Sequence, residues 1–296
     1  MSALEIPPPV VARPRKRRRT RRQRSVKALW NLAALLLLCL LAFPVFWMIS
    51  TAFTPTVEIN SLTPTFVSLH PTLQHFSDAI HKPFFWNAVR ASLIIVTVTV
   101  ALSMVLAFFA AVALAKFRFS GRKLFLVLVI GIQMIPQLGL VIPLYIILGK
   151  YHLTGTLTGV ILAYVTFVLP FSVWTLRGFI IQIPRELEEA AMVDGASRLG
   201  AFVRILLPLV APGFVATSVF AFITSWNEYI FAMILLPNQE NQTVTVWLSY
   251  FTGTSRQIDW GGLMAGATLA AIPVVIFFLM VQRKIAFGLT AGAVKA

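Results

Sequence analysis

The sequence predicts an all-α membrane protein with six transmembrane helices and both termini in the cytoplasm. Of its 296 residues, 58% are hydrophobic and only 12% are charged, and the mean hydropathy is +0.84. A water-soluble domain keeps roughly a quarter of its residues charged. Because so little polar surface cannot cover one water-facing globule, the bilayer is the natural solvent for this chain.

Six apolar stretches are each long enough to cross a hydrocarbon core of about 30 Å as a helix. They are too long for strands and do not alternate between polar and apolar residues. The first is also longer than the apolar region of a cleaved signal peptide, so we expect it to be retained. The expected spans are 29–49, 92–115, 124–148, 157–176, 209–236 and 263–281.

The basic residues indicate the orientation. With the N-terminus inside, the cytoplasmic segments contain 21 of the 25 Lys and Arg residues, as the positive-inside rule requires. Ten of them lie in residues 1–28, a proline-rich and then basic segment that we expect to be a disordered cytoplasmic tail attracted to anionic lipid. The net charge of +15 is therefore explained without a nucleic-acid partner.

The spans divide the remaining chain into three parts. Residues 29–83 form the first transmembrane helix and an outer loop, residues 84–283 the main transmembrane domain, and residues 284–296 a cytoplasmic C-terminal tail. We find no repeat of the kind that builds a transporter from two related halves. A six-span chain of this type is expected to form half of a pore.

The cytoplasmic loop between spans four and five, residues 183–208, is the most informative segment. Pro184 suits the first turn of a helix, and glutamates favour the positive N-terminal end of that helix. Gly195 is a natural helix stop, and Ser197 can cap a second helix that runs to Pro208. The short helix would place four residues on one slim face, namely Leu187, Ala190, Ala191 and Asp194. A solvated loop helix would show the same periodicity.

The spacing within this loop distinguishes a helix whose slim face enters a groove from an ordinary solvated loop helix. Glu189-Ala190-Ala191 is followed after three residues by Gly195 and after nine more by Ile205-x-Leu207-Pro208. The pattern resembles the signature loop of the transmembrane subunits of bacterial ABC importers. The resemblance implies the type I ABC importer permease fold, with 84–283 as its permease domain.

In that family the short helix sits in a cleft of a separate ATPase and transmits its closure to the pore. The resemblance implies that Glu189 pairs with a basic residue of the ATPase, that Ala190 and Ala191 form the close-packed face with Asp194, and that Gly195 makes the turn. The implied partners are a second six-helix permease, an ABC ATPase dimer, an extracytoplasmic binding protein and the lipid bilayer. The chain lacks a glycine-rich phosphate-binding motif, so we expect no cofactor on it, with ATP and Mg on the ATPase.

Two further segments are similar to the carbohydrate subfamily, specifically to the second permease of maltose-type importers. These are Ser225-Trp-Asn-Glu-Tyr229 and Gly288-Leu-Thr-Ala-Gly-Ala-Val-Lys295. They imply import of a sugar, with an oligosaccharide expected, across a bacterial cytoplasmic membrane. A polyol or a glycerophosphate-type solute is the alternative. The resemblance also makes 288–295 a candidate ATPase contact, unless it is a frayed end, and makes the polar loop 237–262 a candidate contact with the binding protein.

Polar residues within the spans are candidates for the translocation path. Polar groups are costly in hydrocarbon and should face the bundle interior or water. The candidates are Gln133, Gln137, Trp226, Asn227 and Glu228. Helix packing and interface anchoring are the alternatives for Trp226 to Glu228.

Other functions have less support. Three histidines in the first outer loop (His70, His75 and His81, beside Asp78) lack the spacing of a zinc site. A membrane enzyme would need paired carboxylates outside the signature loop, and an ion-driven secondary transporter would lack that loop.

Overall fold

A computed structural model describes residues 21–63, 65–253 and 258–293, and every regular element in these ranges is a helix. The chain separates into two units, Met1–Trp47 and Met48–Ala296. Residues 1–20 of the predicted tail lie outside the described residues. Residues 21–28, which were expected to be disordered, instead begin the first helix, as their helix-forming Arg, Gln and Lys side chains allow.

Helix α1 (Arg21–Phe53) contains the first predicted span. Its apolar part, Leu29–Phe53, is 25 residues long and contains no charged residue. A helix of this length and composition can cross the hydrocarbon core of a bilayer. By length and composition, the first predicted span is therefore a membrane-spanning helix.

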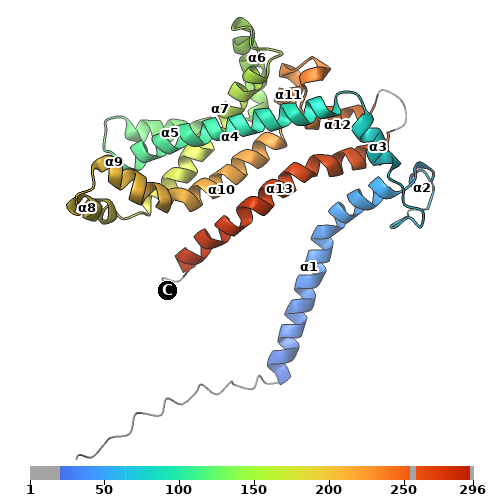
Figure 1. Ribbon diagram of the computed structural model, residues 1–296, viewed down its shortest axis with the longest axis horizontal. Coiled ribbons are helices and arrows are strands. Elements are labelled where there is room, and N and C mark those ends of the chain that lie inside the picture. Colours follow the sequence, from blue (N-terminus) through green and yellow to red (C-terminus); the bar gives the residue numbers. More distant parts are fainter. Residues whose placement is uncertain (1–20, 64, 254–257, 294–296) are drawn as a thin grey trace, which may run out of the picture. The chain divides into compact units, whose positions relative to one another are not determined.

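The second unit is built on four long helices, α4 (Phe85–Lys116), α7 (Leu157–Ile181), α10 (Leu207–Trp226) and α13 (Trp260–Ala293). Helix α4 packs against α7 and α10, and α10 also packs against α13 (Figure 1). Without a hydrophobic driving force in lipid, membrane helices associate through close packing of small residues. Gly213 of α10 is such a point, because an added Cβ would lie 2.6 Å from Cγ of Phe179 on α7.

The third predicted span, 124–148, is broken. Helix α5 (Arg122–Gln133) is followed by the 3₁₀ turn η1 (Gln137–Leu140) and α6 (Val141–Lys150), with a bend of 99°. Pro136 lacks a backbone donor and disfavours helical conformation at the residue before it. The structure therefore has five helices long enough to span a membrane among the described residues, or six when the bent pair counts as one span.

The fifth and sixth spans also differ from the expected boundaries. Helix α10 stops at Trp226, and the short α11 (Ile230–Leu235) follows after three residues, so the run 209–236 is not one helix. Helix α13 continues to Ala293, so residues 284–293 of the predicted tail are helical.

Short elements lie at the two ends of this unit. Helices α8 (Glu186–Val193) and α9 (Arg198–Ala201) lie at one end, and α3 (Gln74–His81) and α12 (Val244–Leu248) lie at the other (Figure 1). The remaining short elements are α2 (Thr56–Ile59), η3 (Gln239–Asn241), η4 (Ser249–Phe251) and the π-helix η2 (Phe202–Leu206).

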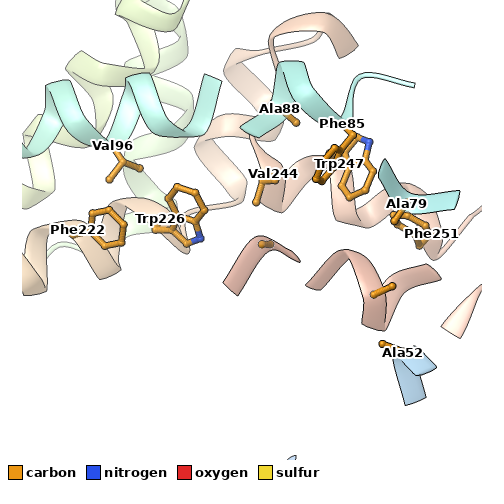
Figure 2. Close-up of a cluster of buried hydrophobic side chains, with 12 residues drawn as sticks. Ala52, Ala79, Phe85, Ala88, Val96, Phe222, Trp226, Val244, Trp247 and Phe251 are labelled. Carbon is orange, nitrogen blue, oxygen red and sulfur yellow. The ribbon is translucent and has the colours of Figure 1, made fainter. Parts of the chain in front are cut away.

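A cluster of buried side chains joins α3, α4, α10, α12 and α13. Phe222 and Trp226 of α10 stack with ring centroids 5.7 Å apart, next to Val96 of α4 (Figure 2). Glycines of α13 allow η4 and α12 to approach, since a Cβ on Gly262 would lie 2.6 Å from the Phe251 ring. This core fixes the end of the bundle opposite α8.

Candidate functional site

The candidate site is the predicted coupling helix, α8, with the turn that follows it. Gly195 has φ +91°, a conformation that side chains other than glycine disfavour. The amide of Ala196 donates to the Ala191 carbonyl at 2.9 Å, and that of Gly195 donates to the Met192 carbonyl at 3.1 Å. This pair of bonds is the Schellman motif, which satisfies the last carbonyls of the helix. The predicted stop at Gly195 is confirmed.

The chain then enters a second helical segment that leads into the membrane. The Ser197 hydroxyl accepts a hydrogen bond from the amide of Gly200 at 3.1 Å, so it caps α9 as predicted. α9, the π-helix η2 and α10 together form a single apolar span from Arg198 to Trp226. Pro208 is the second residue of α10, one residue beyond the π-helix, and its missing donor removes one helical hydrogen bond.

Helix α8 is attached to the end of α4. Nζ of Lys116 lies 2.6 Å from Oε1 of Glu188. Nη2 of Arg185 donates to the Lys116 carbonyl at 2.7 Å, and the Lys116 ammonium donates to the Ile183 carbonyl at 3.4 Å. The last residue of α4 therefore holds the start of α8 through three contacts. Sequence reasoning missed Lys116 and Arg185 because they lie far apart in the chain.

The opposite side of α8 is exposed. Val193 is 87% exposed and Leu187 is 45% exposed, with Ala190 exposed between them. Asp194 and Glu189 are also exposed, whereas Ala191 is half-buried toward α9 and η2. The outward row is therefore Leu187, Ala190 and Val193. The face predicted from the sequence consists of Leu187, Ala190, Ala191 and Asp194, and its docking to a partner stays a prediction.

A cleft of about 340 Å³ lies between α8, α9 and the end of α4. Glu188 and Glu189 line it together with three cations, and its floor includes Phe202 and Leu206. Glu189 forms no ion pair among the described residues, so its carboxylate is available to a partner. The cations that line this cleft are Lys116, Arg185 and Arg198.

Trp226 and Glu228, two of the predicted path residues, are buried and have partners within the chain. Trp226 is part of the aromatic core described above. The Glu228 carboxylate accepts hydrogen bonds from the Tyr164 hydroxyl at 2.7 Å and from the amides of Phe231 and Ala232 at 2.8 and 3.1 Å. Glu228 thus caps α11 and ties it to α7. These are the hydrogen bonds of a helix cap, and a role of Trp226 and Glu228 in the path stays a prediction.

The other three path candidates are exposed in this chain. Gln133 and Gln137 flank the break between α5 and α6. Asn227 donates from Nδ2 to the Ile223 carbonyl at 2.9 Å, which closes the end of α10. A role for these residues in the path stays a prediction.

Two of the three histidines of the first outer loop contact backbone carbonyls through their rings. His75 is buried, with Nε2 3.0 Å from the Thr54 carbonyl, and Nδ1 of His81 lies 2.8 Å from the Ser77 carbonyl. Across the described ranges, no three metal-ligating side chains come together.

Comparison with known proteins identifies the fold and the family. Residues 103–290 match the family described as binding-protein-dependent transport system inner membrane component. The diacetylchitobiose uptake system permease protein DasC of Streptomyces coelicolor is 43% identical over 265 residues, which is 90% of this chain and 96% of DasC. The trehalose/maltose transport system permease protein MalG of Thermococcus litoralis is 35% identical over 274 residues, 89% of this chain and 95% of that protein.

Solved structures agree with this assignment of the fold. A chain of a bacterial ABC transporter involved in the import of the acidic polysaccharide alginate matches with a TM-score of 0.74 and 19% identity, over 90% of this chain and 98% of that chain. A second structure shows the bacterial alginate transporter in complex with an alginate pentasaccharide-bound periplasmic protein, and it matches with a TM-score of 0.64 and 18% identity, over 89% of this chain and 96% of that chain. The predicted ABC importer permease fold is confirmed.

Proposed function

The chain belongs to the family of binding-protein-dependent transport system inner membrane components, and we propose that it is one permease subunit of an ATP-driven sugar importer. Relatives covering most of the chain are named as permeases for diacetylchitobiose, for trehalose/maltose and for trehalose. These names support an oligosaccharide as the solute. The membrane location follows from the family and from the apolar helices.

The proposed importer contains four kinds of subunit. This chain supplies one set of spans, a second permease completes the path, an ATPase dimer binds ATP and Mg, and an extracytoplasmic protein delivers the sugar. The absence of a phosphate-binding motif from the sequence supports ATP hydrolysis on another polypeptide. The periplasmic protein in the related alginate complex supports the delivery step.

The geometry of α8 carries the proposal for energy coupling. The exposed row of Leu187, Ala190 and Val193 is slim and apolar, which suits insertion into a cleft of the ATPase. Glu189 stands beside this row without an ion pair among the described residues, so it can pair with a cation of the ATPase. Asp194 and Gly195 then end the helix and turn the chain toward α9.

Two connections would carry a displacement of α8 into the membrane. The first is the contact of Glu188 and Arg185 with Lys116 at the end of α4. The second is the nearly continuous helical path through α9 and η2 into α10. Packed helices transmit displacement because protein interiors have low compressibility. The ATPase would thus move α4 and α10 together.

The remaining predicted path residues have separate proposed roles. Gln133, Gln137 and Asn227 are exposed and are proposed to line the path with residues of the second permease. Trp226 and Glu228 are proposed to hold the frame that positions them. The segment 288–295 remains a proposed ATPase contact, and its last two residues lie outside the described residues.

Site-specific crosslinking tests the docking. Cysteine replaces Ala190 in a Cys39→Ser background, and the complete complex is treated with a thiol-to-amine crosslinker. We expect a product with the ATPase from position 190 and none from a control cysteine at Tyr151, which is exposed at the predicted outer end. Crosslinking from neither position would contradict the proposed docking helix.

A deletion strain tests the solute class. Loss of growth on N,N′-diacetylchitobiose, trehalose or maltose, restored by the plasmid-borne gene, is the expected result. Unchanged growth on every sugar together with lost growth on glycerol phosphate or a polyol would replace the sugar assignment.

A further inference from the structure

A second cleft lies at the end of the bundle that is predicted to face outward. It has a volume of about 410 Å³ and is walled by the first turns of α4, the 3₁₀ turn η3 and the start of α7. This volume falls within the range of about 300–1,000 Å³ that small-molecule sites occupy. The cleft is separate from α8 and from the predicted path residues, and its residues Glu240 and Asn241 belong to the loop 237–262 that is predicted to contact the binding protein.

Helix α4 supplies one wall through its periodicity. Trp86, Arg90 and Ile94 recur at four-residue spacing, so they lie above one another on one face. Ala91 is buried beside them, and its small side chain gives the cleft depth. The Trp86 side chain is 65% exposed, and its ring meets that of Phe85 edge-on at a centroid distance of 5.0 Å. The indole therefore lines the cleft with most of its surface exposed.

The opposite wall consists of Glu240 and Asn241 of η3, and hydrogen bonds outside the cleft hold the chain on both sides of this turn. The Ser92 hydroxyl accepts from the amide of Val244 at 2.8 Å, which ties the following helix to α4. Gln242 is buried, and its Nε2 donates to the Leu236 carbonyl at 3.2 Å. The amide of Gly155 donates to the Leu235 carbonyl at 2.7 Å. This bond joins the segment before α7 to the end of α11, from which the loop begins. The cleft is thus preformed.

The polar side chains that line the cleft are unused within the chain. Among the described residues, Arg90 and Glu240 form no ion pair and no side-chain hydrogen bond, and the same holds for Asn87 and Asn241. The neighbouring Gln242, in contrast, is fully engaged. These four exposed polar side chains and the exposed indole supply hydrogen-bond donors, acceptors and an aromatic surface that a ligand in the cleft can use.

We propose that this outer cleft binds a neutral saccharide of the imported class. An indole face packs against the apolar CH face of a sugar ring, while amide, guanidinium and carboxylate groups pair with its hydroxyls as donors and acceptors. One arginine and one glutamate leave the cleft without net charge, which favours a neutral polyhydroxylated ligand over an ion. The inference rests on the proposed function and adds a saccharide subsite at the entry side of this chain.

A fluorine probe beside the cleft tests this site directly. Thr158 is exposed and follows the lining residue Leu157, so a cysteine there reports on the cleft without lining it. A trifluoromethyl label is attached in a Cys39→Ser background, and the complete complex is placed in lipid nanodiscs without its binding protein. N,N′-diacetylchitobiose, trehalose and maltose are titrated separately while the fluorine chemical shift is recorded.

We expect a saturable shift with at least one of the three saccharides. Trp86→Ala and Glu240→Gln should each weaken binding about tenfold, which equals about 1.4 kcal/mol. Tyr151→Ala, which removes an exposed aromatic ring elsewhere on the predicted outer side, should leave the affinity unchanged. If Trp86→Ala fails to assemble, Trp86→Phe keeps the ring and should retain most of the affinity.

Three results would overturn the proposal. The first is the absence of a saturable shift with all three saccharides. The second is an unchanged affinity in both Trp86→Ala and Glu240→Gln. The third is a shift that appears only when the binding protein docks. Binding-protein-dependent uptake by the same complex is measured in parallel in proteoliposomes. If the complex takes up sugar but shows no fluorine shift, the saccharide site in the cleft is refuted and the proposed importer function stands. If a shift occurs without uptake of any of these sugars, the proposed importer function is refuted.

Discussion

The ion pair between Lys116 and Glu188 should be needed to couple ATP hydrolysis to transport. Lys116→Met removes the cation that joins α4 to α8, and Glu188→Gln removes its partner. Either change leaves α8 capped and folded, because its stop at Gly195 and the Ser197 cap of the next helix are untouched. The expected defect is therefore in transmission, with assembly preserved.

The size of the effect follows from the burial of the pair. Its N–O distance is 2.6 Å, and its side chains are 12% and 22% exposed. Exposed pairs contribute about 0–1 kcal/mol, and removing one partner of a buried pair costs about 3–5 kcal/mol. We expect about 2 kcal/mol for this intermediate case, which is roughly a 30-fold change in the equilibrium between attached and detached α8.

Sugar transported per ATP hydrolysed in proteoliposomes is the measure of coupling. Each single variant should hydrolyse ATP with reduced uptake. The double variant Lys116→Met/Glu188→Gln should lose less than the sum of the two single losses, because one interaction is removed in all three. Arg118→Met, which removes an exposed neighbouring cation, is the matched control. Additive losses within about 0.5 kcal/mol, or normal coupling in the single variants, would refute the reasoning.

Five further substitutions, one of them a control, test separate parts of the structure. Glu189→Lys should abolish ATPase co-purification by placing like charges together, and a wild-type yield would contradict the proposed contact. Gly195→Ala should destabilise the subunit by about 1–2 kcal/mol because of its φ of +91°, whereas Gly178→Ala inside α7 should be neutral or stabilising in thermal unfolding. Glu228→Gln should cost about 1–3 kcal/mol and Tyr164→Phe about 1 kcal/mol, because the first leaves the α11 cap impaired and the second removes one hydrogen bond. Wild-type stability of Gly195→Ala, Glu228→Gln and Tyr164→Phe would show that the turn at Gly195 and the cap of α11 do not stabilise the subunit.

Hydropathy could predict the spans because bilayer thickness sets a minimum apolar length. It could not predict which prolines break them. Pro44, Pro170 and Pro273 lie inside unbroken helices, whereas Pro136 accompanies a bend of 99°. A membrane helix tolerates proline when neighbouring groups satisfy the freed carbonyl, so the outcome depends on packing that the sequence does not display.

Local chemistry explains why part of the site could be predicted. Gly195 and Ser197 act on backbone groups a few residues away, and such short-range signals are visible in a sequence. The attachment of Arg185 and Glu188 to Lys116 joins distant segments and required the fold.

The hydrogen bonds of the Glu228 carboxylate also could not be predicted from the sequence. Within an apolar run it suggested a path residue, because nothing in the run reveals that α10 ends at Trp226. Once α11 begins as a separate helix, its first amides need acceptors, and the carboxylate supplies them. The partial burial of Ala191 and the exposure of Val193 could not be predicted for a related reason, because the covered side of α8 depends on where α9 and η2 pack.

Reconstitution with subunits omitted one at a time tests the central claim most directly. Vesicles containing this chain, its partner permease and the ATPases should hydrolyse ATP and take up sugar, stimulated by the sugar-loaded binding protein. That stimulation requires the binding protein to prefer one conformation of the complex. Vesicles containing only this chain should do neither. Sugar uptake by the lone chain, driven by a proton or sodium gradient, would contradict the account.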